Sequence, residues 1–328
     1  MSGWESERIA RRWFAKSNSL APVWIAPGGW ALAVGQEFYA EVGGRNLIIP
    51  ANRDIILPES PAPGTDYAIW LSPNGVVQAS SNFVTPPNTP VDRKIGGFHY
   101  APGGNAPARA GGDTTPKINP YSMWDLNFRP ACPDPRGMTL VADSFWMDIY
   151  LLGVDYLVNG TSKYNVTIAD GGSPPKISTK FGGNGTSVYA DGSWHNLGEA
   201  LRHYGKRHPT PAEAEAAFFG TTEASSLGSD PVSTVLNAAY TSKWGVIQST
   251  GVMHIWGSAF GGGAAGASWV ANTGGRGSTY QAENAVLLAG GWSNGGNAGS
   301  GCAYWSNSPA YSLNNIGARG VCDHMRRD

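Results

Sequence analysis

The stretches Asn196-Leu-Gly-Glu-Ala-Leu-Arg-His-Tyr-Gly205 and Thr210-Pro-Ala-Glu-Ala-Glu-Ala-Ala-Phe-Phe-Gly220 carry the clearest structural signals in the chain. In the first stretch, Asn196 can cap a helix whose third position holds Glu199, and the closing glycine can end it. In the second stretch, the opening Thr-Pro-Ala-Glu forms a capping box with proline at the first helical position. The sequence therefore predicts two short helices in the C-terminal half.

Short apolar runs, separated by glycine and proline, surround these two helices. The chain contains 45 Gly and 23 Pro, a frequency that favours short strands and many turns over long helices. Tyr67–Leu71 and Val76–Ala79 flank a Ser-Pro-Asn-Gly turn and predict a β-hairpin. After the second helix, Trp244–Gln248 and Val252–Trp256 are the clearest expected strands.

This pattern divides the chain into three segments and gives an α+β fold class. Residues 1–20 mix apolar and charged side chains, which fits either one amphipathic helix or an extended arm. Residues 21–126 are expected to form a small β-sandwich domain, with a boundary near Trp124–Asn127. Residues 127–328 are expected to form a larger domain that holds both helices.

The balance of charge excludes several classes of partner. The net charge is -1, from 23 Lys+Arg and 24 Asp+Glu, so we expect neither nucleic acid nor anionic lipid as a partner. No apolar run approaches the roughly 20 residues of a membrane helix. The N-terminus lacks the apolar core of a signal peptide, which predicts a soluble chain made in the cytoplasm.

Two motifs that suggest enzymes lack the context that the chemistry needs. Gly291-Trp-Ser-Asn-Gly295 matches a nucleophile elbow, but the glycine-rich sequence after it cannot sustain the required helix. Gly261-Gly-Gly-Ala-Ala-Gly266 matches a dinucleotide-binding fingerprint and fails for the same reason. The sequence therefore predicts no catalytic residue, and Ser293 is not expected to be a nucleophile.

Metal and thiol chemistry are weakly indicated. No pair of histidines has metal-ligand spacing, and His203 and His208 flank the end of a helix, where the dipole favours a cation. No cofactor is expected, although irregular loops rich in aspartate leave room for a structural calcium or magnesium ion. The three cysteines are expected to be small buried thiols and are Cys132, Cys302 and Cys322.

Six long strings stand out between about Ala62 and His324: Lys94–Gly103, Asp134–Ala142, Asp148–Val154, Gly160–Asp170, Phe219–Ala224 and Gly317–His324. Together they resemble the major tropism determinant family, which comprises receptor-binding tail proteins of Bordetella phages. The first sixty residues match this family poorly. The chain is also expected to be too short at its N-terminus for the small β-prism domain of that family.

The resemblance implies both a fold and a function. The larger domain is expected to be C-type lectin-like, of the formylglycine-generating-enzyme type, with a variable region at about residues 285–322. The implied function is adhesion of a phage tail fiber tip, as part of the virion, to a protein or glycan on the bacterial surface. The implied partners are other tail proteins and two further copies of the chain in a homotrimer.

The resemblance also implies which residues vary, because a diversity-generating retroelement rewrites chosen Asn codons of this family at template adenines. Such changes cannot produce Lys, Glu, Gln, Met or Trp, and none of these occurs at the positions matched by register. We call these positions the variable set: Gly291, Ser293, Asn294, Gly295, Asn297, Tyr304, Ser306, Asn307, Tyr311, Leu313, Asn315 and Ile316.

The variable set has the composition of a binding surface even without the family. Tyrosine offers broad contact at low entropy cost, and serine and asparagine offer adaptable hydrogen bonds. We expect these side chains to be exposed. Trp292, Trp305 and the segment Gly317–Cys322, including Arg319, are expected to be a buried scaffold beneath them.

Two other functions remain open. The first is a sulfatase-modifying type of enzyme on the same fold, which would use Cys302 and Cys322 as a reactive pair. The second is a purely structural tail protein, in which Tyr304, Tyr311 and Asn315 would be buried at a subunit contact.

Overall fold

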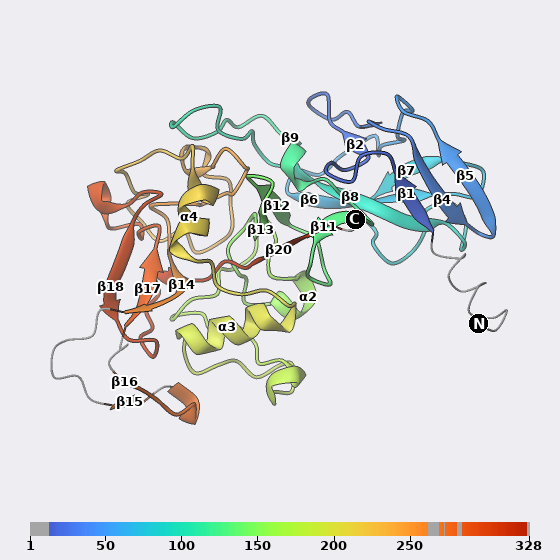
Figure 1. The fold of residues 1–328 in the computed structure, drawn as a ribbon. Coiled ribbons are helices and arrows are strands. Elements are labelled where there is room, and N and C mark those ends of the chain that lie inside the picture. Colours follow the sequence, from blue (N-terminus) through green and yellow to red (C-terminus); the bar gives the residue numbers. More distant parts are fainter. Residues whose placement is uncertain (1–12, 262–268, 272, 281–283, 327–328) are drawn as a thin grey trace. The chain divides into compact units, whose positions relative to one another are not determined.

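The computed structural model describes residues 13–261, 269–271, 273–280 and 284–326, and is mostly sheet with few helices (Figure 1). The described chain forms two compact units. The first unit runs up to Pro102 and also contains Pro116–Ala131 and the C-terminal end from His324, whereas the second contains Gly103–Thr115 and Cys132–Asp323. No described helix has the length and apolar character needed to span a membrane.

This division differs from the single boundary expected near Trp124–Asn127. The loop Gly103–Thr115 belongs to the second unit because its backbone is tied there by hydrogen bonds. The amide of Gly111 donates to the carbonyl of Gly220 at 2.9 Å, and the amide of Gly112 donates to that of Ala238 at 2.8 Å. A glycine-rich sequence gives no local signal from which such long-range hydrogen bonds could be predicted.

The first unit is built from short antiparallel strands around one apolar core. The described part of the expected N-terminal helix or arm is strand β1, while residues 1–12 lie outside the described part. One sheet has the order β1-β4-β5, a second has the order β10-β8-β6-β7 with β9 also on β8, and β2 pairs with β3. The bounds are β1 Phe14–Lys16, β2 Trp24–Ile25, β3 Ala33–Val34, β4 Phe38–Val42, β5 Arg45–Ile49, β6 Thr65–Leu71, β7 Val77–Ser80, β8 Arg93–Ala101, β9 Lys117–Ile118, η1 Pro120–Ser122, β10 Trp124–Asp125 and β11 Phe128–Pro130.

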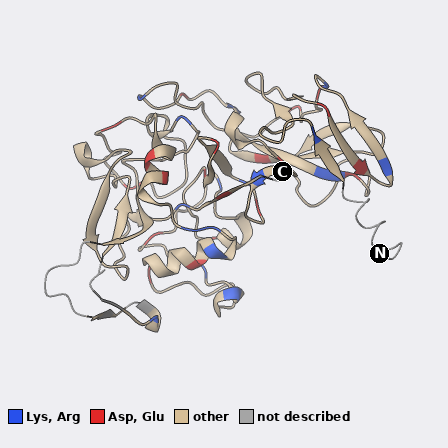
Figure 2. Ribbon diagram, viewed as in Figure 1, with Lys and Arg blue, Asp and Glu red and all other residues tan. Residues whose placement is uncertain are grey.

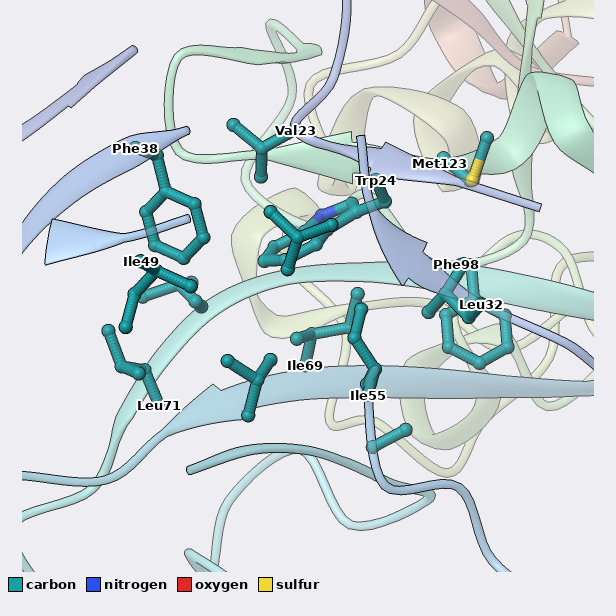
Figure 3. Packing of buried hydrophobic residues seen from close by; sticks show 14 of the residues in the cluster. Val23, Trp24, Leu32, Phe38, Ile49, Ile55, Ile69, Leu71, Phe98 and Met123 are labelled. Atoms are coloured by element: carbon teal, nitrogen blue, oxygen red, sulfur yellow. The ribbon is translucent and has the colours of Figure 1, made fainter. Parts of the chain in front are cut away.

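The core of this unit combines side chains from both sheets, as in a β-sandwich. Phe38 and Ile49 from one sheet and Ile69 and Phe98 from the other belong to one buried cluster, with Trp24 among them (Figure 3). The expected hairpin is confirmed, because β6 and β7 pair through Leu71 and Val77 on either side of the predicted turn.

The second unit contains the four-stranded sheet β18-β17-β14-β19, strands β12 and β13 with the first part of β20 in the order β20-β13-β12, and the β15-β16 hairpin. The end of β20, from His324, pairs with β11 in the first unit. Only the part of β20 up to Asp323 belongs to this unit, where it pairs with β13. The bounds are β12 Met138–Val141, β13 Phe145–Asp148, α2 Tyr156–Asn159, η2 Thr179–Phe181, α3 Trp194–His203, α4 Pro211–Phe218, η3 Ala238–Tyr240, β14 His254–Gly261, β15 Trp269–Ala271, η4 Thr273–Gly275, β16 Ser278–Tyr280, β17 Asn284–Leu288, η5 Gly295–Asn297, β18 Ala303–Asn307, β19 Ile316–Gly317 and β20 Val321–Arg326.

Both predicted helices are present, and one predicted cap is wrong. The capping box of α4 is complete, with the Thr210 side chain accepting from the Glu213 amide and Glu213 accepting from the Thr210 amide. Helix α3, however, begins at Trp194, so Asn196 lies within it rather than at its start. The Asn196 amide instead donates to the Asp191 carboxylate, five positions earlier, at 2.7 Å.

The strand expected at Trp244–Gln248 is absent, because turns occupy this segment. Gln248 has a positive φ of 54°, which is incompatible with an extended strand. The carbonyls of Ile247 and Gln248 accept hydrogen bonds from the buried Arg319 side chain rather than from a neighbouring strand. The next expected strand is present in part, since β14 starts at His254.

The dipole argument for His208 as a cation is also wrong. Its ring is fully buried, and Nε2 lies 3.0 Å from the Trp194 carbonyl. Burial lowers the pKa of His208 to about 4 despite the opposing effect of this hydrogen bond. The imidazole is therefore neutral in the folded protein at neutral pH.

We expect His208 to make the second unit sensitive to acid. A histidine whose pKa falls on folding stabilises the protein fully above its unfolded value of about 6.5, and this contribution is lost as the pH falls towards 4. The loss amounts to roughly 3 kcal/mol at 1.36 kcal/mol per unit. Urea unfolding at pH 7.5 and 4.5 should show that His208→Gln loses less stability on acidification than the parent. Equal losses would contradict this assignment.

Candidate functional site

The sheet β18-β17-β14-β19 brings together segments that are far apart in the sequence. Strand β17 pairs antiparallel with both β14 and β18, and the three strands lie side by side in Figure 1. The short β19 pairs parallel with β14, matching His254 to Ile316. The loop between β18 and β19 therefore returns across the end of this sheet.

An open depression of ≈ 220 Å³ lies where these segments meet. The variable set contributes seven of its nine lining residues, and the strands β14 and β17 contribute the other two. Most of the predicted site is thus gathered around one hollow. The lining residues are His254, Leu287, Asn294, Tyr304, Asn307, Tyr311, Leu313, Asn315 and Ile316.

The exposure of the variable set is mixed. Tyr304, Tyr311 and Leu313 are exposed by 46%, 40% and 43%. Ser293, Gly295, Asn297 and Ser306 are also exposed, and Asn294, Asn307 and Asn315 are half-buried.

Two members of the variable set are buried, contrary to expectation. Ile316 is only 1% exposed, because its place in β19 directs its side chain into the core beside Trp256. Gly291 is held in a bridge with Val252, and a Cβ built on it would lie 3.1 Å from the Cδ2 atom of His254. Backbone pairing, rather than side-chain polarity, sets the burial of both positions.

The scaffold expectation is also wrong for Trp305, which is 37% exposed. It lies on β18, which is the edge strand of its sheet among the described residues. The edge is held by the Asn284 side chain, which donates to the Trp305 carbonyl at 2.8 Å. Trp292 is half-buried and packs against the apolar core, and therefore lies closer to the expected anchor.

Residues outside the variable set hold the loops through their backbone. The carboxylate of Glu223 accepts from both the amide and the hydroxyl of Ser300, at 2.8 and 2.6 Å. The hydroxyl of Ser226 accepts from the amide of Gly295, and that of Ser312 accepts from the amide of Gly192. Within the variable set, the Asn294 side chain accepts a hydrogen bond from the Gly291 amide at 2.8 Å and also contacts the His254 ring. Most of these side chains can therefore change while the loop backbone stays in place.

Arg319 links two buried backbone segments of the second unit. Its side chain is fully buried and donates to four carbonyls, those of Asp148, Ile149, Ile247 and Gln248, at 2.6–3.1 Å. Burial lowers the pKa of Arg319, and the nearby Asp148 opposes this shift. The guanidinium joins the end of β13 to the turn that precedes β14.

The sheet around the depression is almost free of charge. Between Lys243 and Arg319 the sequence contains only two charged residues, Arg276 and Glu283. In Figure 2, strands β14, β17 and β18 carry neither acidic nor basic colour. Burial also lowers the pKa of His254, so its imidazole is neutral at neutral pH. The side chains around the depression therefore offer aromatic rings, amides and hydroxyls to a partner, and no charged groups.

The cysteines do not form the pair that an enzyme of the sulfatase-modifying type would need. The thiol beside Cys322 is that of Cys132, and their hydrogen bond raises the pKa of Cys322. Cys302 is half-buried, and burial raises its pKa, which disfavours the reactive thiolate. Among the described residues, no group of three or more His, Cys, Asp or Glu side chains could hold a metal ion.

Sequence reasoning missed two residues of the depression, His254 and Leu287. Both fall in apolar strand patterns, and nothing in those patterns separates a pocket floor from ordinary core. Ser293 lies in an exposed turn followed by the single-turn 3-10 helix η5 rather than by the α-helix of a nucleophile elbow. The fingerprint at Gly261–Gly266 falls mostly on residues outside the described part of the chain.

Comparison with known proteins identifies the family to which this chain is similar. Residues 28–125 match the family described as the Mtd second domain. The chain is 49% identical over 323 residues to the tail fiber receptor-binding protein of Bordetella phage BPP-1, covering 95% of this chain and 84% of that protein. Similarity therefore reaches well into the first sixty residues, which we had expected to match poorly. Short strands there carry few distinctive sequence strings.

Solved structures agree with the sequence comparison. The M1 variant of the major tropism determinant superposes with a TM-score of 0.93 at 48% identity, covering 98% of this chain and 88% of that one. The U1 variant gives the same TM-score at 47% identity and the same coverage. The chain therefore belongs to the family of phage tail fiber receptor-binding proteins that includes the major tropism determinants.

Proposed function

We propose that this protein is the tropism determinant of a phage tail, and that it binds a bacterial surface receptor through the depression and the exposed residues around it. The observation that carries the proposal is the convergence of seven variable positions, from four segments, on one hollow. Large exposed apolar side chains gathered on one surface are typical of protein or ligand contacts.

The arrangement of the loops supports a surface on which the variable side chains can be substituted without loss of the fold. The side chains of Glu223, Ser226 and Ser312 accept hydrogen bonds from backbone amides around the loops, while most variable side chains make no hydrogen bond to another described residue. A substitution within the variable set therefore changes the contact chemistry at little cost to the fold. This is the property that a retroelement-diversified binding surface requires.

Several finer assignments belong to the same proposal. The second unit is proposed to be the C-type lectin-like domain of formylglycine-generating-enzyme type, and the virion tail fiber its location. Two predictions about assembly remain: that three copies of the chain form a homotrimer, and that this trimer attaches to other tail proteins. If several trimers act together, linked sites would raise the effective affinity by roughly 10²- to 10⁴-fold.

Replacing Tyr304 and Tyr311 with serine together tests the proposal. Exposed aromatic side chains at the centre of a binding surface contribute roughly 2 kcal/mol or more each, so the affinity for receptor-bearing cells should fall at least about 100-fold. The melting temperature should change little, because both rings are exposed. Adsorption of purified protein to sensitive bacteria measures the effect.

The matched control is Tyr39→Ser, at a half-exposed tyrosine of β4 in the first unit. This variant should adsorb like the parent. If the Tyr304/Tyr311 variant folds and still adsorbs within about 3-fold of the parent, a loss below about 1 kcal/mol, the proposed surface is wrong.

A further inference from the structure

Two of the cysteines mark the two ends of the second unit. Cys132 is the first residue of the long segment Cys132–Asp323, and Cys322 is next to its last residue. The two cysteines are about 190 positions apart in the sequence, and both are buried, with 2% and 5% of their surface exposed. A bond between them would therefore close almost the whole of this unit into one loop.

The register of strand β20 directs the two cysteines towards each other. Strand β11 pairs antiparallel with the end of β20, and the last matched pair is Pro130 with His324. Continued by two residues, the same register matches Cys132 to Cys322. Directly opposed residues of antiparallel strands have Cα atoms about 4.5–5.5 Å apart and side chains on the same face. This separation lies within the range that a disulfide spans.

Contacts within the second unit agree with this placement beyond the end of β11, where Cys132 lies in a bend. A Cβ built on Gly205 would lie 4.0 Å from the Cβ of Cys132. Two residues after Gly205, Arg207 pairs with Val321, the neighbour of Cys322. The thiols of Cys132 and Cys322 share a hydrogen bond, so the two sulfur atoms are already in contact in the reduced protein.

The surroundings of the pair favour a thiolate at Cys132. The hydrogen bond that Cys322 donates lowers the pKa of Cys132, and the nearby Lys206 ammonium acts in the same direction, against the effect of burial. The ammonium is held in place because it donates to the Thr161 hydroxyl at 2.7 Å and forms an ion pair with Asp148. The thiolate is the attacking species in thiol–disulfide exchange, so Cys132 is the more reactive member of the pair.

We propose that Cys132 and Cys322 form a reversible disulfide that closes the second unit at its two ends in an oxidising medium. The oxidant is a small disulfide such as oxidised glutathione. The Cys132 thiolate attacks this reagent, forms a mixed disulfide and releases one small thiolate. The Cys322 thiolate then attacks the Cys132 sulfur and releases the second. The protein thus loses two electrons, and the protons of its two thiols pass to the two small thiolates.

The burial of both cysteines determines when this exchange takes place. A small disulfide reaches them during folding, or when β20, the last strand among the described residues, opens locally. The finished link needs no access to solvent, because each sulfur faces the other. By closing a loop of about 190 residues it restricts the unfolded chain, and in the chain-entropy account long loops give the largest stabilisation. The inference does not depend on what the variable set binds.

Refolding the full-length protein in a mixture of reduced and oxidised glutathione tests the proposal. After alkylation in denaturant without a reducing agent, mass spectrometry should find Cys302 alone labelled, and a proteolytic peptide that links Cys132 to Cys322. The same protein refolded with reduced glutathione alone should be labelled at all three cysteines. Three labels after oxidative refolding, a link that includes Cys302, or glutathione retained on Cys132 or Cys322 would overturn the proposal.

Cys302→Ala is the matched control, because it removes the cysteine outside the pair and should form the link as the parent does. Its oxidised form should melt roughly 10 °C above its reduced form. Cys132→Ala should melt at the same temperature in both media. If Cys132→Ala does not fold, the two forms of Cys302→Ala still decide the matter. Melting temperatures of these two forms within about 2 °C of each other would contradict a link that closes the unit.

Discussion

Arg319→Met is expected to lower the free energy of unfolding of the second unit by about 3–5 kcal/mol, because each buried carbonyl left without its donor costs roughly 1 kcal/mol or more. The methionine would fill much of the space but would leave four buried carbonyls without donors. For a unit of this size, the loss corresponds to a fall in melting temperature of roughly 10 °C. Differential scanning calorimetry measures it directly.

Two further variants serve as an intermediate case and as a control for this experiment. Arg319→Lys keeps a positive charge but offers one nitrogen in place of a planar fork, so its loss of stability should be intermediate. Arg45→Met removes an exposed arginine from β5 in the first unit and should change stability by no more than about 0.5 kcal/mol. A melting temperature for Arg319→Met within about 2 °C of the parent would refute the supporting role of Arg319.

Local sequence signals predicted the elements that local interactions determine. The capping box at Thr210 and the turn between β6 and β7 depend on residues within a few positions of one another, and both are confirmed. The cap at Asn196 failed because a competing partner, Asp191, occupies its side chain. The strand expected at Trp244–Gln248 failed because Arg319, about seventy positions away, takes its carbonyls.

The residues of the proposed binding surface follow from the sequence, but their burial and exposure do not. Register with the family gave the variable set, and composition gave its paratope character. Burial then depended on strand order: Trp305 is exposed because β18 is an edge strand, and Ile316 is buried because β19 pairs with β14. His254 could not be identified as a lining residue, because it lies more than thirty positions before the other lining residues and joins them only through the pairing of β14 with β17 and β19.

Exchange of the variable surface is expected to have the largest functional effect of any change. If residues outside the variable set hold the loops, as Glu223 and Ser226 do, the segment Ala285–Cys322 of another variant should fold on this chain. The recipient should then acquire the receptor preference of the donor. A loss and a gain of roughly 100-fold in affinity, equivalent to about 2.7 kcal/mol each, are expected for the two receptors.

The control for this exchange is a reciprocal chimera in the first unit. Replacing the β4–β5 hairpin, Phe38–Ile49, with that of the same donor changes at most twelve residues, as many as the variable set contains, far from the variable region in sequence. That chimera should keep the adsorption preference of the parent. A switch in preference caused by the hairpin would mean that the first unit, rather than the variable surface, recognises the receptor.

The most direct measurement is therefore adsorption of phage that carry the Ala285–Cys322 exchange to two bacterial strains, each sensitive to only one of the parental variants. Our account predicts that adsorption follows the donor of the segment, with melting behaviour preserved. A folded chimera whose host range is unchanged would contradict the claim that this surface determines tropism.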